Sequence, residues 1–133
     1  MKKRNGFSLI EILIALAIMG MISALTAPQF SKIYQGSKKH AIKVIMHSLQ
    51  VSLESYLFLE GYYPNGTQLT LPQLLAIINH EEILYSLPKN PYTNQLYNTS
   101  DESGSILYNE TENGYTLSGY GNQNQTLILS LTN

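Results

Sequence analysis

The sequence predicts an α+β fold in which one long N-terminal helix, membrane-spanning in its first half, packs on a small antiparallel β-sheet. Three observations support this prediction. Residues 7–27 are almost entirely apolar, residues 29–59 carry apolar side chains at helical spacing, and three short strand-like runs follow residue 104. A chain of 133 residues has room for one modest domain of this kind.

Composition and charge exclude several functions. Seven of the eight basic residues lie in the first 43 positions, and eight of the nine acids come after Val44. The acidic distal part would repel phosphate groups, so no nucleic-acid binding is predicted. The chain has no cysteine, which excludes disulfides, thiol catalysis and Cys-ligated metal sites.

Residues 7–28 are predicted to cross a membrane. The run from Phe7 to Ala27 has 21 residues and a single charge, Glu11. At about 1.5 Å per residue, this run forms a helix of roughly 31 Å, which matches the hydrocarbon core of a bilayer.

Residues 1–6 form a short leader with three consecutive basic residues, and this cluster predicts that the N-terminus lies in the cytoplasm. A plain signal anchor and a cleaved secretory signal are the alternative interpretations. The long apolar run disfavours the second, as does Leu25, which lies where a signal cleaved after Ala27 needs a small residue.

Glu11 is the anomaly of the apolar run, because a carboxylate in that position costs on the order of 3 kcal/mol. If the chain were cut after Gly6, Phe7 would carry a new α-ammonium group about one helical turn away. That amine, from the same chain or from a neighbouring one, would offset much of the free-energy cost of burying the Glu11 carboxylate. The helix dipole also favours a carboxylate at this end of the helix. The alternative is a Glu at the headgroup edge that snorkels or stays protonated.

The segment Gly6-Phe-Ser-Leu-Ile-Glu11, after a basic leader and before an apolar run, resembles the N-terminal motif of type IV pilins and pseudopilins. The resemblance implies that a prepilin peptidase cuts between Gly6 and Phe7 and N-methylates Phe7. It also implies that Glu11 pairs with the Phe7 amine of an adjacent subunit during filament assembly. The implied partners are this peptidase, identical and related pilin subunits, the cytoplasmic membrane and the pilus assembly machinery.

Gly20 and Pro28 fall where pilins commonly carry a Gly and a Pro, which makes them candidate assembly residues. Gly costs about 1 kcal/mol relative to Ala inside a helix. Pro28 lacks the donor that would reach the Ala24 carbonyl, so we expect a mild kink at the membrane boundary. The sharper hypothesis is that the stretch between these two residues loses helical form in the assembled filament.

Residues 29–60 are predicted to form an amphipathic stalk helix, and residues 61–133 a globular head. Within the head, Leu71–Asn79 fits a short helix with Thr70 as its N-cap. The predicted apolar stripe of the stalk consists of Ile33, Ala41, Ile45, Leu49, Leu53, Tyr56, Leu57 and Leu59.

Three strands, Ser105–Asn109, Gly114–Ser118 and Thr126–Leu131, are predicted to form an antiparallel meander. The turns are expected at Asn113-Gly114 and around Gly119 and Gly121. A short extra strand is expected near Leu96-Tyr97. The pilin-like fold, a long N-terminal helix against an antiparallel sheet, agrees with this reading of the residues.

No catalytic residue, metal site or cofactor is predicted. His40 and His47 lie seven residues apart, which is wider than zinc motifs prefer. Asp101-Glu-Ser-Gly104 is a conceivable calcium loop, but carboxylates in turns are usually solvated.

The predicted function is a structural subunit of a type IV pilus or pilus-like filament. The alternatives are a pseudopilin of a type II secretion or competence system, or a membrane-anchored binding module that never polymerises. A tethered enzyme is a third class, for which the sequence offers no constellation. The predicted location is a single pass through the cytoplasmic membrane and then an extracellular or periplasmic filament. Without the leader, the bases cluster on the stalk and the acids on the head, so one subunit's head is predicted to meet another's stalk electrostatically.

Overall fold

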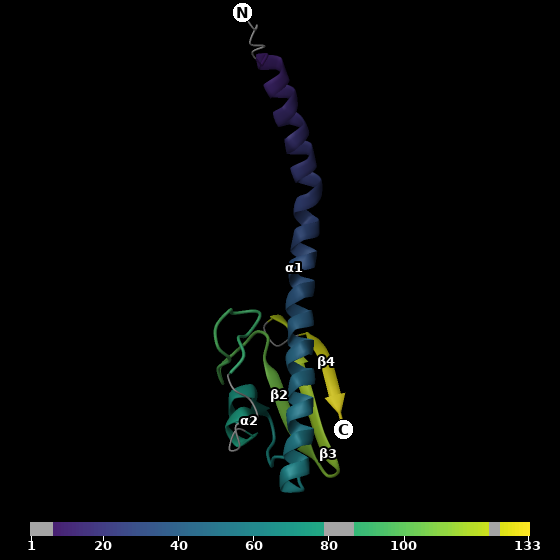
Figure 1. Ribbon diagram of the computed structural model, residues 1–133, viewed down its shortest axis with the longest axis vertical. Coiled ribbons are helices and arrows are strands. Elements are labelled where there is room, and N and C mark those ends of the chain that lie inside the picture. The colour runs from purple at the N-terminus through teal and green to yellow at the C-terminus, as the bar shows by residue number, and fades with distance from the viewer. Residues whose placement is uncertain (1–6, 79–86, 123–125) are drawn as a thin grey trace, which may run out of the picture. The chain divides into compact units, whose positions relative to one another are not determined.

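The computed structural model describes residues 7–78, 87–122 and 126–133 (Figure 1). It confirms the α+β class. The chain divides into two compact units, one ending at Gly36 and one beginning at Ser37. The elements, in chain order, are α1 (Leu9–Glu60), β1 (Leu69–Thr70), α2 (Leu71–Ile78), β2 (Ile106–Thr111), β3 (Gly114–Tyr120) and β4 (Leu127–Thr132).

The 52 residues of α1 form one unbroken helix that includes both Gly20 and Pro28. Pro28 has no N–H to donate to the carbonyl one turn earlier, and the helix continues on both sides of it. The helix ends at Gly61, whose φ of +82° places it in the left-handed region that favours glycine after a helix. Its amide donates to the Leu57 carbonyl at 2.8 Å.

The four strands follow one another in space in the order β1-β2-β3-β4, and every pair is antiparallel. The three predicted strands are confirmed to within two residues at each end. The turn between β2 and β3 is one residue earlier than predicted, because Gly114 already pairs with Thr111. The extra strand expected near Leu96 is reduced to an isolated bridge with Lys89.

β1 was not predicted from the sequence. It adds two residues to the edge of the sheet, where Leu69 pairs with Tyr108. The chain then enters α2 directly. The Thr70 amide donates to the Gln73 side chain at 2.9 Å, which confirms Thr70 as the N-cap.

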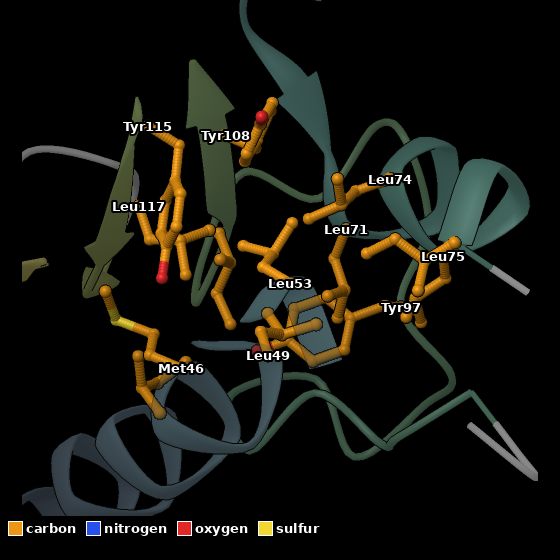
Figure 2. Packing of buried hydrophobic residues seen from close by; sticks show 13 residues of the cluster. Met46, Leu49, Leu53, Leu71, Leu74, Leu75, Tyr97, Tyr108, Tyr115 and Leu117 are labelled. Atoms are coloured by element: carbon orange, nitrogen blue, oxygen red, sulfur yellow. The ribbon is translucent and has the colours of Figure 1, made fainter. Parts of the chain in front are cut away.

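The core of the head lies between the second half of α1, the sheet and α2. Met46, Leu49 and Leu53 of α1 point toward Tyr108, Tyr115 and Leu117 of the strands (Figure 2). On the other side of this cluster lie Leu71, Leu74 and Leu75 of α2, together with Tyr97. The buried helix positions are Ile42, Met46, Leu49, Ser52 and Leu53, at helical spacing.

The predicted stripe of α1 is buried at Leu49 and Leu53 and exposed at its two ends. Ile33 is 64% exposed and Leu59 is 58% exposed. Ile42 and Met46, absent from the predicted stripe, have no exposed surface. The stripe therefore follows the part of the helix that the sheet covers, not the full run of apolar residues.

Gly119 was predicted to lie in a turn, and it lies inside β3 instead. A Cβ atom at this position would meet the Met46 sulfur and lie 2.9 Å from the Ile42 Cγ2. Only a residue without a side chain allows α1 to approach the strand this closely. Gly119 thus sets the distance between helix and sheet at one end of the core.

Candidate functional site

The first turn of α1 contains the predicted functional carboxylate and its nearest polar partner. The Ser8 backbone N–H donates a hydrogen bond to Glu11 Oε2 at 2.9 Å. The Ser8 carbonyl in turn accepts the first helical hydrogen bonds, from the amides of Glu11 at 3.0 Å and Ile12 at 3.4 Å. This is one of the two bonds of a capping box, the one in which the third helical residue satisfies the amide of the N-cap.

The capping role of Ser8 was missed from the sequence. The signal was present, because Ser8-Leu-Ile-Glu11 has the spacing of a capping box directly before an apolar run. The structure thus gives Glu11 an intramolecular role in addition to the predicted intermolecular one.

The apolar part of α1 is fully exposed. In the range 7–36, every described side chain lies on the surface, and Phe7 is 83% exposed. Among the described residues, α1 is the one helix long and apolar enough to cross a membrane, with a mean hydropathy of 2.3 over its best window, none of it buried. Signal sequences have a similar length and composition. The N-terminal motif, and not the apolar run alone, therefore identifies the kind of membrane segment.

The predicted site residues lie along one helix. Phe7 precedes α1, and Glu11 lies in its first turn. Gly20 has open space around it, and Pro28 lies inside the helix. Gly6 lies outside the described residues. The described site residues thus follow one another along a single helix and form an extended helical surface.

The polar groups of the head are engaged in structural hydrogen bonds. Asp101 Oδ2 accepts from Asn90 Nδ2 and from the Asn98 amide, both at 3.0 Å. Asn90 Nδ2 also donates to the Ser103 carbonyl at 2.8 Å, and its Oδ1 accepts from the Tyr92 amide. The Asp101 loop is therefore held by protein donors. In the described ranges, no group of three or more His, Asp or Glu side chains is arranged to hold a metal ion.

A second polar cluster connects α1 to the sheet through Glu54. Its carboxylate accepts from the hydroxyl groups of Tyr63 at 3.2 Å and Tyr115 at 3.3 Å, and from Asn133 Nδ2 at 2.7 Å. The rings of Tyr63 and Tyr115 meet edge to face, with centroids 4.9 Å apart. Burial raises the pKa of Tyr115 above its ordinary value, and the nearby Glu54 charge raises it further. These hydrogen bonds connect α1 to the sheet, so the cluster is structural. A tyrosine with a raised pKa stays protonated and is not activated as a nucleophile.

Two comparisons with known proteins found similarities. The family model described as "Prokaryotic N-terminal methylation motif" matches residues 1–27. The "Type II secretion system core protein G" of Escherichia coli (strain K12) is 30% identical over 101 residues, which cover 69% of this chain and 69% of that protein. No solved structure matches the chain significantly.

Proposed function

Because the chain belongs to the family of pilins and pseudopilins, whose members are structural subunits, we propose that it assembles into a type IV pilus or a pilus-like filament. In this proposal, residues 1–6 are a leader, residues 7–28 the membrane and filament-core helix, residues 29–60 the stalk, and residues 61–133 the head. The observation that carries the proposal is the apolar half of α1, whose described side chains are all exposed.

That exposed surface requires an apolar environment. A bilayer supplies one before assembly, with the basic leader retained in the cytoplasm. After extraction, only other apolar helices can cover a surface of this size, since large exposed apolar surface is otherwise a liability in water. Neighbouring copies of α1 have the same length and composition. Bundling of these helices is thus the assembly step.

Processing prepares the first turn for this step. Cleavage behind Gly6 by a prepilin peptidase, followed by N-methylation, leaves a charged amine on Phe7. Glu11 Oε2 already accepts the Ser8 amide. A carboxylate has further lone pairs, so Glu11 can also accept from an ammonium group of an adjacent subunit. Pairing the two charges lowers the energy of both inside the bundle.

A role in secretion is the second candidate. The similarity to the type II secretion protein of Escherichia coli favours a pseudopilin, which uses the same processing and the same helix packing in a filament of the secretion system. A membrane-anchored module that never polymerises is the remaining alternative, and it requires neither cleavage nor pairing of Glu11.

The intact mass of the protein in sheared surface filaments tests the proposal. The expected mass lacks Met1–Gly6 and includes one added methyl group. Recovery only from membranes, at full length, would contradict filament assembly and favour the anchored module.

Deletion of the gene then distinguishes the two filament types. Loss of surface filaments with normal protein export indicates a pilus. Loss of export without loss of surface filaments indicates a secretion pseudopilus.

A further inference from the structure

The unit that begins at Ser37 carries its charges at separate places. Lys38, Lys39 and Lys43 lie where α1 enters this unit, and after Lys43 the sequence contains one more base, Lys89. Glu60 ends α1, and Glu110 and Glu112 lie at the turn between β2 and β3. All three of these acidic side chains are exposed.

The end of this unit that carries Glu60, Glu110 and Glu112 is called the acidic end. It lacks the basic side chain that is favourable near a helix C-terminus. The last turn of α1 contains no basic residue and ends in Glu60. The carbonyl end of a helix carries a partial negative charge, so a carboxylate there is unfavourable and a cation is favourable. The charge of Glu60 and the partial charge of the helix end are thus not offset by any basic side chain in the last turn of α1.

A cleft is present at the same end. Its volume is about 410 Å³, and its lining includes Leu57, Tyr62, Tyr63, Glu110 and Glu112. Tyr62 is 51% exposed and supplies an aromatic wall. Carboxylates beside an aromatic ring form an environment that suits a lysine ammonium group.

Lys39 and Lys43 are the matching basic groups. Both are exposed, and they lie four residues apart on one face of α1, where like charges repel each other. Neither has an acid three or four residues away on the helix. Lys38 differs from them, because its Nζ lies 5.3 Å from the centre of the Tyr92 ring in the same head.

We propose that Lys39 and Lys43 of one subunit bind the acidic cleft, formed by Glu110, Glu112 and Tyr62, of a second copy of this chain. The inference rests on the proposed filament function and names one of its subunit contacts. The two surfaces are different, so the contact is head-to-tail, and such a contact propagates into an open filament when the rotation between copies does not close a ring. Lys43 and Glu60 are 17 residues apart on α1, so joined copies are displaced by roughly 26 Å along this helix.

Charge reversal tests the contact. The double variants Lys39→Glu/Lys43→Glu and Glu110→Lys/Glu112→Lys should each lower the filament yield about tenfold or more, because like charges then face each other. The chain that carries all four substitutions should recover most of the yield. The matched control is Glu102→Lys against Glu112→Lys, since both make the same charge change at an exposed position and only the second lies in the cleft.

Cysteine cross-linking gives a second measurement that does not depend on charge. The chain has no native cysteine, so Lys43→Cys/Glu112→Cys has only the two new thiols. Within one subunit, Glu112 lines the cleft together with Leu57, which is 14 residues or about 21 Å along α1 from Lys43. This separation exceeds the roughly 7 Å between Cα atoms that a disulfide allows. Oxidation of assembled filaments should therefore give a ladder of disulfide-linked multimers.

The outcomes separate this contact from the proposed function. If the parent chain forms no filament at all, the proposed function fails first. If the parent assembles but the four-residue swap does not restore yield and no ladder forms, the contact is wrong while the filament function stands. Cross-linking only to a different protein would likewise overturn a second copy as the occupant.

Discussion

The Ser8 amide and the Glu11 carboxylate are joined by a hydrogen bond of 2.9 Å within one helical turn. After cleavage behind Gly6, Ser8 would still carry this N–H, because it belongs to the peptide bond that follows Phe7. The carboxylate proposed to pair with a neighbour thus also stabilises the first turn of its own helix.

Glu11→Gln and Glu11→Ala separate these two roles. Gln keeps an acceptor for the Ser8 amide but has no charge, whereas Ala removes both and costs about 1 kcal/mol of helix stability. We expect filaments to be lost in both variants while the subunit remains in the membrane. The yield of sheared filaments and the amount in the membrane fraction are the measurements. Filaments of Glu11→Gln at the parent yield would assign Glu11 to capping alone.

Gly119→Ala should destabilise the head by about 1–3 kcal/mol, because the added methyl group overlaps Met46 and crowds Ile42. The control is Gly36→Ala, at a helical position with nothing within 4 Å, which should stabilise the chain by about 0.5–1 kcal/mol. Urea unfolding of the full chain in detergent, followed by circular dichroism, measures both. Equal stability of the two variants would contradict the close approach of α1 and β3.

The head should lose stability as the pH rises above about 10. Burial raises the pKa of Tyr97, Tyr108 and Tyr115 above the ordinary value of 10.0. Above that pH the unfolded chain releases protons that the folded head retains, so the free energy of unfolding falls as pH increases. Tyrosinate absorbance and circular dichroism, recorded together, should show exposed tyrosines ionising first and buried ones only on unfolding. A single ionisation phase with the head still folded would contradict this.

Asn90→Asp should destabilise the head by about 3 kcal/mol or more at neutral pH. Asn90 is fully buried, and the substitution replaces its Nδ2, a donor 3.0 Å from Asp101 Oδ2, with a second carboxylate oxygen. The loss should shrink in acid, where one carboxyl group is protonated. Thermal unfolding at two pH values measures it, with Asn113→Asp in an exposed turn as the control. Similar melting temperatures for the two variants would show that Asn90 is not held as described.

Strong local patterns explain what the sequence predicted well. The apolar run after Phe7, the N-cap at Thr70 and the alternation in the three later strands each depend on neighbours in the chain. β1 is only two residues long, which is too short for any period, and it exists because β2 pairs with it. Its position therefore depends on tertiary structure.

The errors in α1 and β3 have one common cause. From the sequence, Gly119 resembles a turn residue, and Ile42 and Met46 are two of many apolar residues in a long helix. In the structure these three residues meet, and the contact itself determines which helix face is buried. Local sequence does not contain that information. The role of Ser8 was, in contrast, readable from its spacing to Glu11.

The contacts of α1 also constrain the order in which the head folds. Glu54 and Tyr115 are 61 residues apart in the chain, and Met46 is farther still from Gly119. During synthesis the buried face of α1 therefore emerges long before β3, its partner, exists. Folding dominated by such distant contacts is slow and leaves apolar surface open to aggregation. Any factor that shields α1 until β3 is complete should raise the yield of folded subunits.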